Sequence, residues 1–113
     1  MPKATPIPAH SRAVVMDRDK RCVRCGASGV VQWHHRRSRR VPGEHQHCPC
    51  NGVLLCPHCH THVHANPAES GQRGLIVSSY IDEPSSIPVK TYRGWETHDC
   101  AGHHAAFPER NTA

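Results

Sequence analysis

The sequence has few of the residues that build an apolar core. Of its 113 residues, 36% are hydrophobic and only 4% are aromatic. A chain of this length and composition has room for one domain and cannot bury a large core, which excludes a fold held together by apolar packing alone. It also lacks a signal peptide and any apolar run of membrane-spanning length. We therefore expect no membrane partner and a reducing, cytoplasmic location.

Acidic residues are nearly absent from the middle of the chain. Glu44 is the only acid between Lys20 and His64, whereas eight of the fourteen Lys and Arg residues fall between Arg18 and Arg40. Such a cationic segment attracts polyanions, and nucleic acid is the most common of these for a basic soluble protein. The alternative is a solvated Arg-rich loop that serves only solubility.

Cysteine and histidine are abundant, with seven and twelve residues. The odd thiol count favours metal binding over disulfides. The spacing within Cys22/Cys25 and Cys56/Cys59 lets both sulfurs of each pair reach one ion, so we predict a structural Zn²⁺ bound by all four. Two independent reduced pairs or a redox dithiol are the alternative, but the strand and helix pattern of a thioredoxin-like site is missing.

Local patterns predict an α+β fold. Ser11 is a candidate N-cap for a helix over residues 11–20, and Pro57 is a suitable first residue for a helix that continues to Glu69. Residues 30–33 and 53–55 are expected to form strands, and residues 74–81 and 89–95 short β segments. The predicted organisation is a flexible tail (1–10), a zinc-stabilised domain (11–69), a C-terminal β extension (70–99) and a disordered tail (100–113).

Four histidines have the spacing of a hydrolytic metal site. On a helix that begins near Pro57, His60 and His64 are one turn apart and face the same way, so both can bind one ion, although such a pair also occurs on solvated helix faces. His34 and His35 follow a strand and point to opposite faces, so one can reach the metal and the other an attacking water. Phosphodiester hydrolysis needs this combination of base and cation.

Asn51 precedes the second predicted strand and has two possible roles. Its side-chain oxygen can accept the other N–H of the base, or its amide can pin the loop. Asn51-Gly52 also favours an ordinary turn with positive φ, and this interpretation is compatible with either role.

These motifs together resemble the zinc-finger-containing HNH endonucleases over residues 18–66. The resemblance rests on the first Cys-x-x-Cys pair, on Trp33-His34-His35, and on the order of Asn51, the second Cys-x-x-Cys pair, His60 and His64. It implies a ββα-metal fold, in which a two-stranded hairpin and a helix surround one divalent ion. The implied catalytic residues are His35 as general base, Asn51 as the residue that orients it, and His60.

The resemblance also implies what binds at the site. His34 and His60 would be ligands of the catalytic ion, which could be Mg²⁺, Mn²⁺, Ni²⁺ or Zn²⁺, and His64 a further ligand or a phosphate contact. The arginines that follow the presumed base would contact DNA phosphates without reading sequence; they are Arg36, Arg37, Arg39 and Arg40.

The predicted function is metal-dependent nicking or double-strand cutting of DNA, with duplex DNA as substrate, by a monomer or weak dimer. The segment from Gly74 to Trp95 is similar to small HNH proteins of bacteriophages and actinobacteria. Phage relatives often assist genome packaging, so terminase proteins are expected partners, in the host cytoplasm. A DNA-binding zinc module without catalysis would leave the histidines and Asn51 unexplained. A protein-interaction zinc ribbon would not need the cationic loop.

The loop before Asn51 departs from the family pattern. Where family members usually have Gly and Asp, this chain has Cys48, Cys50 and two additional imidazoles. They could form an accessory zinc site with Cys100, His103 or His104, compete for the structural zinc, or have no ligand role. The sequence leaves these alternatives open.

Overall fold

The computed structural model describes residues 6–108, which form a small α+β structure, as predicted. The predicted tails fall partly on residues 1–5 and 109–113, which lie outside the described residues. None of the helices between residues 6 and 108 is long and apolar enough to cross a membrane. The elements in chain order are α1 (Ala9–Asp19), β1 (Gln32–His35), the 3₁₀ helix η1 (Pro49–Asn51), β2 (Gly52–Leu55), α2 (Pro57–Ala65), α3 (Pro67–Gln72), the 3₁₀ helix η2 (Pro84–Ser86), β3 (Val89–Thr91), β4 (Gly94–His98) and β5 (His104–Ala106).

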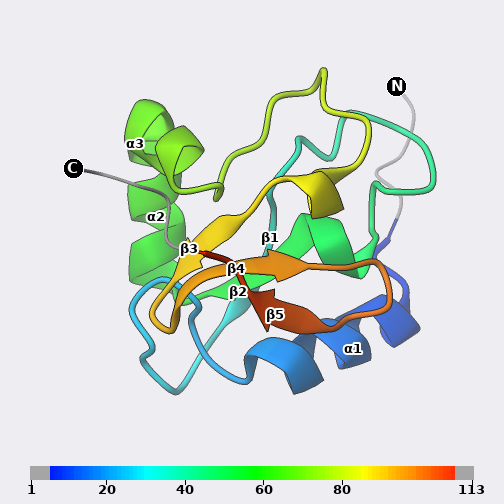
Figure 1. Cartoon of the computed structure of the whole chain (residues 1–113). Coiled ribbons are helices and arrows are strands. Elements are labelled where there is room, and N and C mark those ends of the chain that lie inside the picture. Colours follow the sequence, from blue (N-terminus) through cyan, green and yellow to red (C-terminus); the bar gives the residue numbers. More distant parts are fainter. Residues whose placement is uncertain (1–5, 109–113) are drawn as a thin grey trace.

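Strands β1 and β2 form an antiparallel hairpin, and α2 follows it directly (Figure 1). Helix α2 packs against both strands. Pro57 begins the helix because its missing N–H would have no intrahelical partner there. The predicted single helix to Glu69 is instead two helices, because Asn66 precedes Pro67 and leaves the helical region with φ −130° and ψ 65°. The β1–β2 hairpin and α2 together position the histidines predicted for the site.

Gly52 makes room for a tryptophan and does not form a turn with positive φ. Its φ of −111° and ψ of 138° are those of an extended residue at the start of β2. A Cβ at this position would lie only 2.0 Å from Cζ2 of Trp33 on the neighbouring strand. The interpretation of Asn51-Gly52 as a positive-φ turn was therefore wrong, and the glycine serves close packing.

A buried ion pair at the end of α1 joins this helix to β2 through further hydrogen bonds of both side chains. The Nε of Arg18 lies 2.7 Å from Oδ1 of Asp19, and both side chains are almost completely buried. Arg18 also donates to the carbonyls of Pro49 and Gly52, while Asp19 accepts from the backbone N–H of Leu54. Arg18 therefore belongs to the interior and not to the cationic surface.

The C-terminal part forms a three-stranded antiparallel sheet in the order β3-β4-β5. The expected β segment at residues 89–95 is divided between β3 and β4, whereas residues 74–81 make only one isolated bridge, from Val77 to Arg37. Strand β5 lies in the segment expected to be disordered. A tight turn leads into it, because Oδ1 of Asp99 accepts from the backbone N–H groups of Ala101 and His103.

The apolar core is small and includes cysteines. Its buried members are Cys22, Val23, Val53, Leu55, Cys59, Val63, Leu75 and Val89. Two of these residues belong to the two Cys-x-x-Cys pairs. The sulfur cluster and the apolar core are therefore one continuous interior, and a disturbance of either affects the other.

Two of the four arginines assigned to phosphate contacts are buried. Arg36 is 1% exposed and Arg37 is 5% exposed. The Arg36 guanidinium donates to the backbone carbonyls of Gly74, Cys50, Pro84 and Ile87. The Arg37 guanidinium donates to the carbonyls of Ile81 and Asp82, each at 2.8 Å. The assignment needs correction, because both groups bind the protein's own backbone and tie the end of β1 to the C-terminal segment.

Replacing Arg36 by Met should lower the free energy of unfolding by about 3 kcal/mol or more, because several buried carbonyls would lose their charged donor. Urea unfolding of the zinc-loaded protein measures this change. The control is Arg40→Met at an exposed position, for which a change within about 0.5 kcal/mol is expected. Equal stability of the two variants would show that the Arg36 contacts do not hold the fold.

Candidate metal centre and active site

The four cysteines of the two Cys-x-x-Cys pairs come together as predicted. The sulfurs of Cys22, Cys25, Cys56 and Cys59 all lie within 4.8 Å of one another. The Sγ atoms of Cys25 and Cys56 are 3.9 Å apart. Thiolates at ~2.3 Å from a tetrahedral ion lie about 3.8 Å from one another. The cluster therefore fits a structural metal such as zinc.

Backbone N–H groups and one arginine surround these sulfurs. Ala27 N donates to Cys25 Sγ at 3.5 Å, Cys59 N to Cys56 Sγ at 3.4 Å, and Arg24 Nη1 to Cys59 Sγ at 3.3 Å. Burial, reinforced by the neighbouring thiols, nevertheless raises the pKa of Cys59 to about 12. Four thiolates so close together repel one another, and a bound cation is what allows all of them to ionise.

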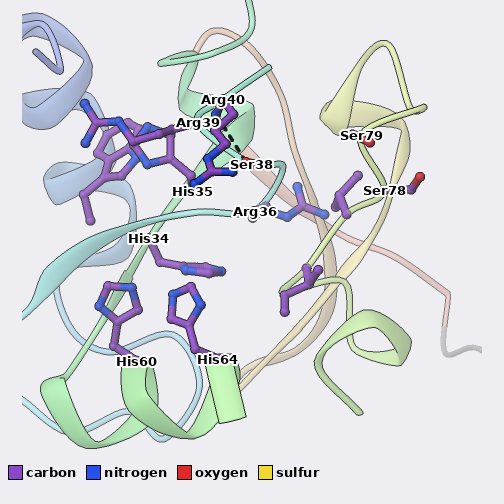
Figure 2. Close-up of a pocket in the computed structure, with 13 residues that line it drawn as sticks. His34, His35, Arg36, Ser38, Arg39, Arg40, His60, His64, Ser78 and Ser79 are labelled. Carbon is purple, nitrogen blue, oxygen red and sulfur yellow. Dashed lines mark hydrogen bonds between the residues drawn. The ribbon is translucent and has the colours of Figure 1, made fainter. Parts of the chain in front are cut away.

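Three histidines form a second cluster. Nitrogen atoms of His34, His60 and His64 lie within 4.8 Å of one another. The ring centroid of His34 is 5.2 Å from that of His60 and from that of His64, and the last two are 4.9 Å apart. Figure 2 shows the ring of His34, from β1, above the rings that α2 projects. The expected one-turn spacing of His60 and His64 thus brings both to the same point.

Hydrogen bonds leave a nitrogen lone pair on two of these rings. His34 Nε2 donates to the carbonyl of Leu75 at 2.6 Å, so its Nδ1 carries the lone pair. His60 Nδ1 lies 2.8 Å from the side-chain oxygen of Gln32, so its Nε2 is unprotonated. Metal-binding histidines have this arrangement, in which the second nitrogen donates to an oxygen. Burial lowers the pKa of His34 to about 4 and lowers the pKa of His60, which favours the neutral rings that bind metal.

The histidine cluster opens into a groove of about 810 Å³. His35 also lines this groove, although it lies on the other side of β1 from His34, as the alternation of a strand requires (Figure 2). Arg39 and Arg40 line it as well, with exposed side chains. The groove therefore combines a possible metal site, a further imidazole and two surface cations.

The ring of His35 contacts a histidine that the sequence did not single out. His35 Nε2 lies 3.0 Å from Nδ1 of His47. Burial, followed by the charges of His47 and Arg39, lowers the pKa of His35 to about 4. His35 is therefore neutral near pH 7 and able to accept a proton. His47 was only one of several loop imidazoles, and no spacing rule linked it to His35 twelve residues earlier.

Asn51 pins the loop, and its side-chain hydrogen bonds go to the backbone and not to the His35 ring. Its Oδ1 accepts from the backbone N–H of Arg37 at 2.6 Å, and its Nδ2 donates to the carbonyls of Arg37 and Gln46. The side chain is fully buried. Both the oxygen and the NH₂ group of the Asn51 side chain therefore serve the loop-pinning role. Asn51 acts on His35 only through the backbone, and it fixes the residue next to His47.

The additional thiols form a third cluster, separate from the structural one. Ligand atoms of His45, Cys48, Cys50 and Cys100 lie within 4.8 Å of one another. Of the partners that the sequence offered, Cys100 is in this group. His103 and His104 instead contact Asp99 at 3.4 Å and Glu96 at 2.9 Å. The imidazole of the cluster is that of His45.

Removing a histidine from the second cluster should weaken divalent metal binding. We expect His60→Ala to lower the affinity for Mn²⁺ or Ni²⁺ by about 100-fold or more, because a ligand and its neutral lone pair are lost. Calorimetric titration of zinc-loaded protein measures this affinity. His58→Ala, an exposed imidazole on the same helix, is the matched control. Unchanged affinity in His60→Ala would contradict the metal site.

Comparisons of the chain with protein-family models, with curated proteins and with solved structures found no match.

Proposed function

We propose that the protein is a divalent-metal-dependent endonuclease of the HNH type that hydrolyses phosphodiester bonds in DNA. The observation that carries the proposal is the content of one groove, where His34, His60 and His64 converge and His35 is also present. Strand β1 supplies His34 and His35 and helix α2 supplies His60 and His64, and strand β2 lies between them in the chain. This order agrees with the ββα-metal fold that the sequence motifs imply, which we include in the proposal.

His35 is the proposed general base. Its lowered pKa keeps the ring unprotonated near neutrality, so it can take a proton from an attacking water. This role requires His35 Nε2–H to donate to His47 Nδ1, which leaves Nδ1 of His35 to accept the proton. His47 then orients the base, while Asn51 holds the backbone on both sides of this contact.

His34, His60 and His64 would hold the divalent ion. When bound, the cation would supply charge stabilisation for the phosphate oxygens and the departing 3′ oxygen. The donor set consists of imidazole nitrogens, and the rings of His34 and His60 are fixed in orientation by Leu75 and Gln32. Imidazole ligands suit zinc or nickel better than magnesium or manganese. For the separate four-sulfur cluster we propose Zn²⁺, because thiolate ligands select it.

Duplex DNA is the proposed substrate. Arg39 and Arg40 are exposed on the groove and are suited to phosphate contacts, whereas Arg36 and Arg37 are committed to the interior. These two exposed guanidinium groups next to the base would hold the backbone of the nucleic acid over the metal cluster. Terminase partners, a monomer or weak dimer and a cytoplasmic location stay predictions from the sequence.

The nuclease proposal predicts EDTA-sensitive nicking of supercoiled plasmid in the presence of Mn²⁺, Ni²⁺, Mg²⁺ or Zn²⁺. His35→Ala should slow cleavage by about 100-fold or more, because the base is lost while the metal ligands remain. His58→Ala should cut at the rate of the unmodified protein. Circular dichroism and zinc content establish that the His35 variant is folded. If the unmodified protein binds DNA yet leaves it intact with every ion, the protein is a non-catalytic DNA-binding zinc module.

The phosphate contacts predict a specific salt dependence. The slope of log K against log salt concentration should fall by about 0.9 for each of Arg39→Gln and Arg40→Gln, because each variant releases one counterion fewer. Fluorescence anisotropy with a labelled duplex measures the slope. Arg12→Gln, an exposed change on α1, is the control and should leave the slope unchanged. Equal slopes in all three variants would place the DNA elsewhere on the protein.

A further inference from the structure

The two cysteine clusters account for every thiol in the chain. Four of the seven cysteines form the cluster between the β1–β2 hairpin and α2. The other three, Cys48, Cys50 and Cys100, lie around His45. We propose that His45, Cys48, Cys50 and Cys100 bind a second structural zinc ion. This proposal does not depend on the proposed nuclease activity.

The distances in this cluster approach those of a tetrahedral site. His45 Nδ1 lies 3.9 Å from Cys50 Sγ and 3.8 Å from Cys100 Sγ. In a zinc site with one imidazole and three thiolates, nitrogen and sulfur lie about 3.6 Å apart. A contraction of a few tenths of an ångström around the ion would therefore complete the geometry. Four protein ligands leave no open position, which is characteristic of a structural site and not of a catalytic one.

The second nitrogen of His45 faces carboxylates. His45 Nε2 lies 3.6 Å from Oε1 of Glu44 and 3.9 Å from Oε1 of Glu83. Metal-binding histidines commonly donate their outer N–H to a carboxylate, which fixes the tautomer and makes the ligand nitrogen more basic. The carboxylates near Nε2 favour a proton on that nitrogen, which leaves Nδ1, the nitrogen that faces the sulfurs, as the ligand.

The backbone already holds the ligands in place. Cys48 N donates to the carbonyl of His45, and Asn51 N to that of Cys48, so three ligands share one compact turn that includes η1. Cys100 lies in the turn before β5. That turn approaches α1 so closely that a Cβ at Gly102 would lie 1.9 Å from Cγ1 of Val14. The turn that carries His45, Cys48 and Cys50 and the turn that carries Cys100 are far apart in the sequence. Each is held in place by its own contacts.

A disulfide explains the cluster less completely than a metal. It would use two of the three thiols and leave the third, together with His45 and its carboxylates, without a role. A zinc ion uses all four groups and joins the loop before β2 to the sheet formed by β3, β4 and β5. His47 lies between two of the ligands, so the ion would also fix the residue that contacts His35.

Zinc counting by native mass spectrometry tests the second site. We would use the full chain with His60→Ala, so that the histidine cluster does not contribute zinc. This protein should carry two zinc ions, and the addition of Cys100→Ser should leave one. The control is the addition of His103→Ala, an exposed imidazole close to Cys100 in sequence, which should leave two. One zinc in the starting protein, or two in the Cys100 variant, would overturn the proposal.

A second measurement covers the case in which Cys100→Ser unfolds and loses both ions. Iodoacetamide labelling of the unmodified, zinc-loaded protein, read by peptide mass spectrometry, reports each thiol separately. Although Cys100 is exposed, it should react at least about 10-fold more slowly than in chelator-treated protein, because a zinc-bound thiolate is shielded. Cys48 and Cys50 should be protected in the same way. Rapid labelling of Cys100, or a disulfide among the three, would refute the second zinc site.

Discussion

The meeting of four sulfurs is the contact on which the rest of the structure depends. Cys22 and Cys25 precede the β1–β2 hairpin, and Cys56 and Cys59 follow it, so one ion would close the hairpin at its open end. Cys22 and Cys59 are also members of the apolar core, which is small for a chain of this length. A metal that binds the sulfurs therefore adds to the core what the few apolar side chains cannot supply.

The same contact sets the direction of α2 and hence the position of the histidines. Cys56 caps the helix, Cys59 points to the other sulfurs, and His60 points to His34 and His64. Strand β1 has a matching division, because His34 turns towards the cluster and His35 towards His47. Helix α2 thus directs Cys59 to the sulfur cluster and His60 to the histidine cluster, and strand β1 directs His34 to the histidine cluster and His35 to His47. The periodicity of each element is enough to separate its two side chains.

Local spacing in the sequence was enough to predict the α+β class, the hairpin followed by a helix, the sulfur cluster and the pairing of His60 with His64. It could not separate buried from exposed arginines, because Arg36 and Arg40 belong to one basic run and only carbonyls from distant loops distinguish them. It also missed the contact of His35 with His47, and it left open which of Cys100, His103 and His104 accompanies the loop thiols. His45 and Cys100 are 55 residues apart, and only the tertiary fold brings them together.

The most direct test of the central role of the sulfur cluster is the ¹H–¹⁵N NMR spectrum of Cys59→Ser, compared with that of the zinc-loaded unmodified protein. If the four sulfurs hold α2 on the hairpin, the signals of His34, His60 and His64 should lose their dispersion, although all three rings are retained. The unmodified protein should lose the same dispersion on chelation and regain it when zinc is returned. A Cys59 variant that keeps these signals at their native positions would contradict the account.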